Sequence, residues 1–351
     1  MVQLQYIRAI AALLVVYYHA ILQLQKVLPG SSLTSADIGD SGVDLFFVLS
    51  GFVMSVTTSA RPVSTFEFYW KRIRRIAPLY WSATVAAALA ALLVPTLLRS
   101  TVFDPAHVLA SFLFIPWVNP APGLESMIAP IVVPGWTLNY EMYFYFVFGI
   151  MLLLPQGMRL IGLTGVFAIV AISCSLLPFE NAATLFYGNS VVFEFLAGAA
   201  IGHQYMTAER LTIGRGLPLL AAGTFLLLAN NYLDPAINRF FALGIPATVI
   251  VYAVTAVDFS GVRPVVWLRK LGDASYSIYI THGFVLAGTR VLFAAMPFAV
   301  LKNEMVFVVA SLAMSIAVGV AIHSLFESPV DRYLKRRELP EGPVGEPVRS
   351  R

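Results

Sequence analysis

Residues 5–25 read QYIRAIAALLVVYYHAILQLQ, an apolar run that carries one arginine, Arg8, and one histidine, His19. A helix needs about 20 apolar residues to cross a hydrocarbon core about 30 Å thick. An ionisable side chain in such a helix costs about 2.5–3.5 kcal/mol on insertion scales, so it points inward, has a partner and marks function by default. This stretch therefore predicts a membrane-spanning helix with a functional histidine near its middle.

The rest of the chain has the composition of a membrane protein. Hydrophobic residues make up 58% of its 351 residues, charged residues make up only 12%, and the mean hydropathy is +0.78. A soluble domain needs a charged surface, and about 25% charged residues are usual. The composition excludes a soluble globule, a disordered chain, collagen and a coiled coil, and it predicts an all-α integral membrane protein. The lone cysteine, Cys174, excludes an intrachain disulfide.

Ten apolar segments have the length of a membrane span, and we expect about ten transmembrane helices. They are residues 5–25, 42–60, 76–97, 136–155, 158–177, 187–206, 214–232, 238–257, 274–296 and 304–327. A shorter apolar segment near 106–118 leads into prolines and predicts a short re-entrant or interfacial segment. We expect residues 1–337 to form the membrane domain and the Pro- and Gly-rich residues 338–351 to form a disordered cytoplasmic tail.

The basic residues give this topology a direction. With both termini in the cytoplasm, 17 of the 23 Lys and Arg fall in cytoplasmic segments, four fall on the opposite side, and Arg8 and Arg290 lie within spans. This asymmetry follows the positive-inside rule, and counting 106–118 as a further span would destroy it. The sequence therefore predicts a multi-pass protein with cytoplasmic N- and C-termini.

Several polar side chains within or beside the first three spans are candidate functional residues. His19 follows Arg8 by eleven residues, which returns to nearly the same helix face about 16 Å further along the axis. Arg72 and Arg75 share a face at the start of the third span, which fits either a phosphate clamp or a topology anchor at the lipid headgroups. Asp44 is expected to be a buried charge partner or a structural group rather than a catalyst.

Two later spans also carry polar groups. Glu141 follows Trp136 and Asn139 in the fourth span, and its carboxylate is expected to orient a histidine, bind a hydroxyl or neutralise a buried arginine. Tyr279 and His282 share a helix face in the ninth span. The sequence has no GxxxxGK[ST], HExxH or GxSxG motif and no zinc-ligand spacing, so we expect no metal.

Seven motifs, in chain order, resemble those of the membrane acyltransferase-3 family. They are residues 5–16 with His19, GVDLFFVLSGF at 42–52, RIRRIAPLYW at 72–81, WTL at 136–138 with Glu141 and Phe144-Tyr145, FEFLAG at 193–198, residues 271–279 with His282, and ESP at 327–329. The resemblance covers nearly the whole chain, and the common order of the motifs makes it specific.

The resemblance implies a ten-helix enzyme that moves an acetyl or other acyl group from acetyl-CoA to a hydroxyl of an exopolysaccharide or lipid-linked glycan. Residues 1–337 would then be a membrane acyltransferase domain in the bacterial inner membrane. The length is most similar to that of the exopolysaccharide (succinoglycan-type) O-acetyltransferases. The implied partners are a carbohydrate acceptor and membrane lipid, with no nucleic acid, and the oligomeric state stays open, a homo-oligomer included.

For the site, we expect His19 to accept a proton and Glu141 to orient His19 or the acceptor, and an acyl-histidine relay is equally compatible with the sequence. The residues expected to bind CoA phosphates are Arg8, Arg72 and Arg75. The expected substrate-binding or supporting residues are Asp44, Trp136, Asn139, Tyr279 and His282. The alternative hypothesis is a transporter or flippase for a lipid-linked glycan, with these side chains as its polar pathway.

Overall fold

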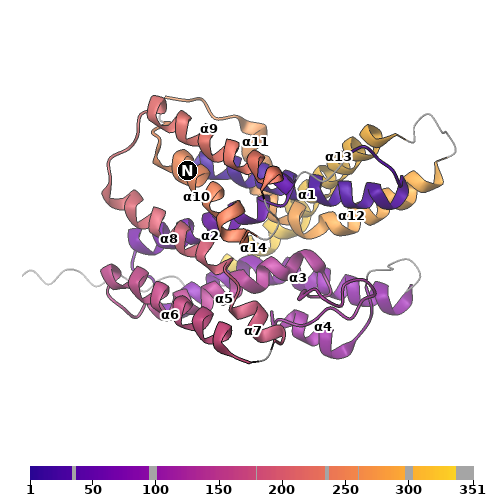
Figure 1. Ribbon diagram of the computed structural model, residues 1–351, viewed down its shortest axis with the longest axis horizontal. Helices are drawn as coiled ribbons and strands as arrows, with labels where there is room; N and C mark the ends of the chain where they lie inside the picture. Colours follow the sequence, from indigo (N-terminus) through magenta and orange to yellow (C-terminus); the bar gives the residue numbers. More distant parts are fainter. Residues whose placement is uncertain are drawn as a thin grey trace, which may run out of the picture.

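The computed structural model describes the chain apart from residues 34–36, 95–100, 179, 234–236, 260, 297–302 and 337–351. Most of the described residues are helical, and most helices run roughly along the long axis of the molecule (Figure 1). Helices suit a lipid environment because each one satisfies its backbone hydrogen-bonding groups internally. The predicted disordered tail at 338–351 lies outside the described residues.

Each of the ten predicted spans coincides with a helix. These helices are α1 (Val2–Val27), α2 (Gly42–Ala60), α3 (Thr65–Leu93), α5 (Trp136–Met151), α6 (Gln156–Leu176), α8 (Val192–Thr207), α9 (Ile213–Ala229), α10 (Ile245–Ala256), α12 (Ser275–Ala295) and α13 (Glu304–Ile322). Within the described residues, seven helical segments are long and apolar enough to cross a membrane. The predicted all-α architecture is confirmed. The criteria of length and apolarity identify seven membrane-spanning segments, so they do not confirm the predicted number of ten.

Short helices and turns connect the long ones. They are α4 (Pro105–Phe112), α7 (Ala182–Tyr187), α11 (Val266–Asp273), α14 (Ser328–Arg336), the 3₁₀ turns Asp37–Gly39, Val133–Gly135 and Asn230–Tyr232, and the π-helical turns Phe240–Gly244 and His323–Glu327. The predicted re-entrant segment near 106–118 contains α4 and then leaves the helical conformation at Leu113. Eight helical residues are too few to span a bilayer.

The third span begins earlier than predicted. Its helix, α3, starts at Thr65 and not near residue 76, because Ser64 caps it by accepting a hydrogen bond from the Glu67 backbone N–H at 3.2 Å. Arg72 and Arg75 therefore lie in the third turn of the helix, where the helix itself fixes their direction.

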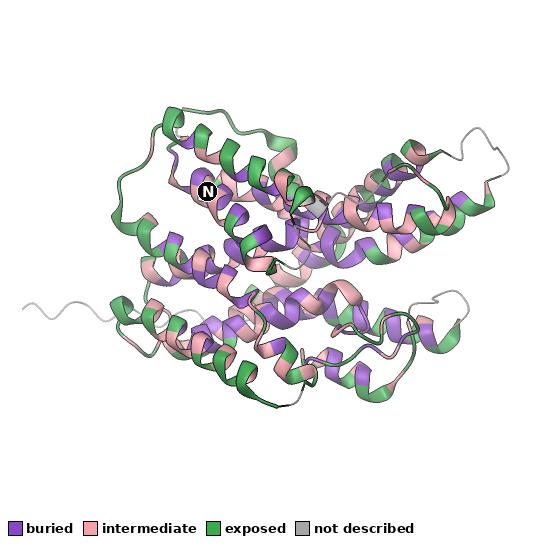
Figure 2. Cartoon of the chain, in the orientation of Figure 1, coloured by how far each residue is buried: buried purple, intermediate pink, exposed green. Residues whose placement is uncertain are grey.

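The helices form two groups in the view of Figure 1, with α3–α7 below and α1, α2 and α8–α13 above. Buried residues lie on the helix faces that meet, and exposed residues cover the outer faces (Figure 2). Helix α6 has only Leu163 and Phe167 buried within it, which is typical of a helix that faces lipid. The candidate site lies where α3 and α5 of the lower group meet α1, α2 and α12 of the upper group.

Helices α2 and α8 cross at backbone contact because each has a glycine at the crossing. A Cβ on Gly51 would lie 2.0 Å from the carbonyl oxygen of Phe195, and a Cβ on Gly198 would lie 1.9 Å from that of Val48. Small residues let membrane helices approach closely and gain van der Waals contact. The crossing fixes α2, which supplies one wall of the candidate site.

We expect Gly198→Ala to destabilise the protein, although alanine is the better helix former, because the new Cβ would overlap the Val48 carbonyl oxygen. The expected loss is about 1–3 kcal/mol, the usual range for overpacking. Thermal unfolding of the purified protein in detergent measures it. Gly165→Ala is the matched control, since nothing lies within 4 Å of a Cβ there. Equal unfolding midpoints for the two variants would contradict the close crossing.

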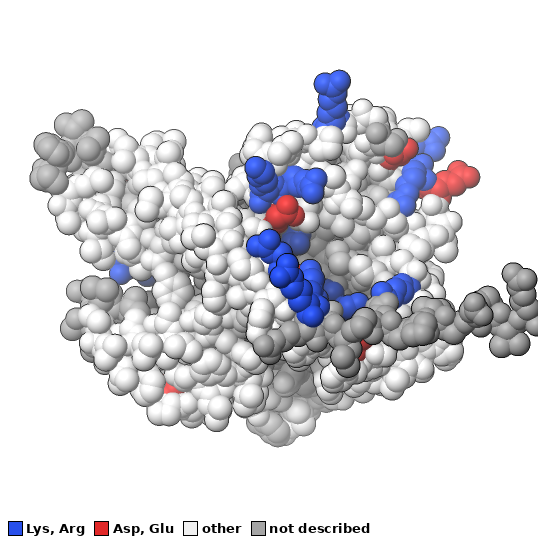
Figure 3. Space-filling model, turned by 180° about the vertical axis from the view of Figure 1, so that it is seen from behind, with Lys and Arg blue, Asp and Glu red and all other residues white. Residues whose placement is uncertain are grey.

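Lys and Arg side chains gather at one end of the molecule. Figure 3 shows them, on the face in view, over the half that contains the N-terminus in Figure 1, beside a hollow in the surface. The opposite half of that face shows few of them among the described residues. The two ends of the helices therefore differ in charge, as expected for a protein inserted in one direction.

Candidate active site

A cavity of about 150 Å³ lies between α1, α2, α3, α5 and α12. Its polar wall consists of Arg8, Ser50, Arg72, Arg75, Thr137, Glu141, Tyr145, Tyr276 and Tyr279. The three arginines predicted to bind phosphate thus meet Glu141, although they come from α1 and α3 and the glutamate from α5. Ser50 and Tyr145 belong to two of the family motifs, but nothing in their spacing singles them out as site residues.

Arg75 is held by a carboxylate that was not predicted to take part in the site. It forms an ion pair with Glu327, which lies at the end of a π-helical turn and is only 6% exposed. Glu327 also accepts hydrogen bonds from Ser277 Oγ at 2.6 Å and pairs with His323 Nδ1 at 3.0 Å. Because Arg75 belongs to α3 and Ser277 to α12, Glu327 ties these two helices together.

Arg8 and Arg72 differ from Arg75 because neither has an ion pair with a carboxylate within the described residues. The guanidinium of Arg72 lies 5.9 Å from the ring centroids of Phe68 and Tyr145, and its buried Nε has no hydrogen-bond partner there. Arg8 lies on the wall of the same cavity. Guanidinium groups that face a cavity without a carboxylate partner are suited to bind an anion, and phosphate above all.

Glu141 is fixed by two hydroxyl groups. Its Oε1 accepts a hydrogen bond from Ser50 Oγ at 2.6 Å and another from the Tyr145 hydroxyl. No hydrogen bond joins Glu141 to His19 within the described residues, and its role in orienting His19 or the acceptor stays a prediction. The imidazole of His19 is held by the backbone carbonyl oxygen of Val15, one helical turn earlier in α1, which lies 2.9 Å from Nδ1.

His19 and His282 form a pair, with ring centroids 4.9 Å apart. Nδ1 of His19 lies 2.9 Å from the Val15 carbonyl oxygen, and Nδ1 of His282 lies 2.5 Å from that of Tyr279. A carbonyl oxygen only accepts, so each Nδ1 carries the proton and each Nε2 of the neutral ring has a lone pair. His282 is fully buried and His19 is half-buried, which makes His19 the more accessible proton acceptor.

Tyr279 separates the cavity from the histidine pair. Its ring lines the cavity and lies 5.8 Å from the ring of His282, and neither histidine is among the residues that line the cavity. The Tyr279 hydroxyl is bonded to Thr137 Oγ1 at 2.9 Å and to the Pro134 carbonyl oxygen at 3.1 Å. Tyr279 and its hydrogen bonds therefore lie between the arginine cavity and the histidine pair.

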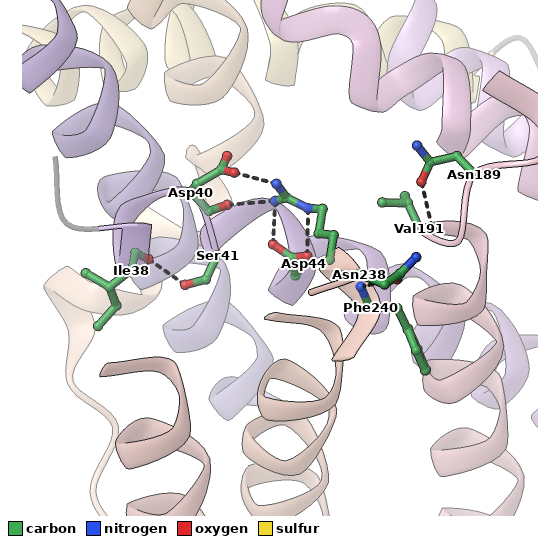
Figure 4. Close-up of polar contacts among 9 residues, drawn as sticks. Ile38, Asp40, Ser41, Asp44, Asn189, Val191, Asn238 and Phe240 are labelled. Carbon is green, nitrogen blue, oxygen red and sulfur yellow. Dashed lines mark hydrogen bonds and ion pairs between the residues drawn. The ribbon is translucent and has the colours of Figure 1, made fainter. Parts of the chain in front are cut away.

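The remaining predicted residues lie outside this cavity. Both carboxylate oxygens of Asp44 bind Arg239, at 2.7 and 3.1 Å, and Arg239 also pairs with Asp40 (Figure 4). Asp44 is thus a buried charge partner. Trp136 packs among aromatic rings, and Asn139 is 1% exposed with no hydrogen-bond partner for its amide among the described residues. Nowhere among the described residues do three His, Cys, Asp or Glu side chains form a group that could hold a metal ion.

The acyltransferase-3 family model, described as an acyltransferase domain, matches residues 1–324. The chain belongs to the acyltransferase-3 family. It is therefore an acyltransferase, and its family decides for this class over the transporter hypothesis. The family motifs that carry Arg8, Ser50, Arg72 with Arg75, Glu141 and Tyr279 all contribute to the wall of the cavity.

Two relatives extend this assignment. This acyltransferase is 35% identical over 323 residues to the exopolysaccharide production protein ExoZ of Rhizobium meliloti (strain 1021). The alignment covers 88% of this chain and 94% of ExoZ. It is 24% identical over 334 residues to the acyltransferase MdmB of Streptomyces mycarofaciens. That alignment covers 86% of this chain and 83% of MdmB. No solved structure matches the chain. Together with the apolar helices, the family makes this a multi-pass membrane acyltransferase.

Proposed function

We propose that this acyltransferase moves an acetyl group from acetyl-CoA to a hydroxyl of an exopolysaccharide or lipid-linked glycan. The observation that carries the proposal is the cavity that unites Arg8, Arg72, Arg75 and Glu141 next to the histidine pair. The name of ExoZ, an exopolysaccharide production protein, supports a carbohydrate acceptor.

The donor fits the cavity only in part. Ligand pockets are usually about 300–1,000 Å³, and the 150 Å³ of this cavity suits the narrow pantetheine arm rather than the whole CoA molecule. The nucleotide would stay at the arginine-rich end, with its phosphates at Arg8 and Arg72. His19 lies about 16 Å beyond Arg8 along α1, a distance similar to the length of the pantetheine arm.

In the proposed reaction, Nε2 of His19 takes the proton of the acceptor hydroxyl while the hydroxyl oxygen attacks the thioester carbonyl carbon. The carbon–sulfur bond breaks, and the CoA thiolate leaves and takes up the proton from the imidazolium. The products are the glycan ester and free CoA. Tyr279 turns aside to let the thioester reach His19. An acyl-imidazole on His19 gives the same products in two steps.

The acceptor is proposed to arrive from the other end of α1. Gln23 lies one turn beyond His19, and its Oε1 accepts a hydrogen bond from Nη1 of Arg290 at 2.9 Å. Arg290 lies eight residues beyond His282 on α12, about 12 Å along the axis. Polar groups thus follow the histidine pair on the side away from the phosphate-binding arginines, as a sugar acceptor requires.

We also propose that all ten helices cross the bacterial inner membrane, with both termini in the cytoplasm. The end with the N-terminus carries most of the Lys and Arg on the face in Figure 3, which supports this direction. In the proposed orientation, the arginine cavity would face cytosolic acetyl-CoA and the histidine pair would lie deeper in the membrane.

The test is transfer of label by the purified full-length protein. Radiolabelled acetyl-CoA is incubated with the protein and candidate glycans, and we expect an alkali-labile ester on the glycan. Glycan incubated with label but without protein is the control. If label appears only as free acetate with every glycan tested, or if vesicles move the glycan without forming an ester, the proposal is contradicted.

A further inference from the structure

A larger cavity lies on another face of α1. Its volume is about 800 Å³, and its wall is mostly apolar. Its lining includes Ile10 and Leu14 of α1, Leu220 of α9 and Ile250 of α10. Ile10 and Leu14 point about 120–160° away from Arg8 around the helix, so this cavity is distinct from the arginine cavity. Residues 2 to 14 border it, which corresponds to about 18 Å along α1.

A polar pocket of about 250 Å³ adjoins this cavity. The two share Gln3, Val254 and Phe259 in their walls, so they meet beside the start of α1. The polar pocket contains Arg210 and Asp258, and Arg263 lines the apolar cavity close in sequence to the shared Phe259. An apolar cavity about 18 Å long therefore ends among charged side chains.

Two contacts orient Arg210, which is exposed and lines the same polar pocket as Asp258. Its Nη1 donates to the Thr255 carbonyl oxygen at 3.2 Å, and its guanidinium carbon lies 3.3 Å from the ring centroid of Tyr205. These contacts fix the direction of the guanidinium but do not neutralise it. Arg263 is exposed. Basic pockets between membrane helices on the cytoplasmic side bind lipid headgroups.

We propose that the two cavities together bind one phospholipid, with a fatty acyl chain in the apolar cavity and the phosphate at Arg210 and Arg263. An acyl chain matches apolar walls through dispersion contacts, and a phosphate matches two guanidinium groups. This site goes beyond the proposed acyl transfer and does not depend on it. Because α1 carries His19 as well as one wall of the site, the lipid stabilises the helix that holds the imidazole.

A phospholipid fits this site better than the polyprenyl tail of a glycan carrier. The cationic end of the site lies beside the N-terminus, at the opposite end of α1 from Gln23 and Arg290. A carrier with its phosphate at Arg210 would hold its glycan far from the histidine pair.

Native mass spectrometry of the full-length protein in detergent, titrated with phosphatidylglycerol, tests the proposal. The wild type is expected to keep one phosphatidylglycerol molecule after partial delipidation. The variant Arg210→Ala with Arg263→Ala is expected to bind it about tenfold more weakly, which corresponds to about 1.4 kcal/mol. The variant Arg215→Ala with Arg269→Ala is the matched control, because it removes the same charge outside the walls of both cavities.

The apolar part has its own pair of variants. Leu220→Trp fills the cavity and should reduce retention by a similar factor, whereas Leu217→Trp, at a position 58% exposed on the same helix, should not. Equal retention by the cavity and control variants overturns the proposal. So does equal retention of diacylglycerol, which has no phosphate, or a preference for polyprenyl phosphate over phosphatidylglycerol.

Discussion

His19→Ala is expected to lower the rate of acyl transfer at least a hundredfold, within the range of about 10²–10⁴ that general acid–base catalysis contributes. The imidazole has its Nδ1 proton committed to the Val15 carbonyl oxygen, which leaves Nε2 to accept the proton of the attacking hydroxyl. An alanine retains the helix but has no proton acceptor. Initial rates of label transfer from acetyl-CoA to the glycan measure the loss.

His203→Ala is the matched control for this prediction. His203 lies on α8, is exposed and does not line the arginine cavity, so we expect a rate within about twofold of the wild type. The thermal unfolding midpoint of His19→Ala should stay close to that of the control. Full turnover by a folded His19→Ala protein would refute the role of the imidazole in both the direct mechanism and the relay.

Arg72→Ala is expected to raise the KM for acetyl-CoA at least tenfold with a smaller change in kcat, since a phosphate contact is present in both the ground state and the transition state. Arg72 is the most informative of the three arginines. Arg75→Ala would also remove the arginine partner of Glu327 and weaken the link between α3 and α12. Arg72 has no such carboxylate partner within the described residues.

Arg72→Lys distinguishes the two roles that the motif spacing leaves open for Arg72, a phosphate clamp and a topology anchor at the lipid headgroups. A topology anchor needs only a positive charge, so lysine would replace arginine without loss. A phosphate clamp needs the planar guanidinium, so lysine should recover only part of the affinity. Arg336→Ala, at an exposed position on α14, is the control. An unchanged KM in both Arg72 variants contradicts the clamp.

Much of the architecture could be predicted because membrane helices are specified locally. A run of apolar residues between polar segments fixes each helix, which is why all ten predicted spans coincide with helices. The start of α3 was missed because its polar first turns conceal the capping serine, Ser64, from a search for apolar runs.

The contacts of the site could not be predicted in the same way. Ser50 and Glu141 are 91 residues apart, and Arg75 and Glu327 are 252 apart, so no helical period relates them. The sequence showed that these polar groups must point inward. It did not show which of them meet, because that depends on how the helices cross, as at Gly51 and Gly198.

If CoA binds at the arginines as proposed, the contact between Arg75 and Glu327 couples donor binding to the position of Tyr279. A CoA phosphate that draws Arg75 towards itself competes with Glu327, and Glu327 holds Ser277, two residues before Tyr279 on α12. By thermodynamic reciprocity, CoA binding weakens the Arg75–Glu327 ion pair by the same free energy by which that ion pair weakens CoA binding. With such a coupling, the way past Tyr279 would open only when the thioester is bound, and the bilayer would stay sealed to small ions between turnovers.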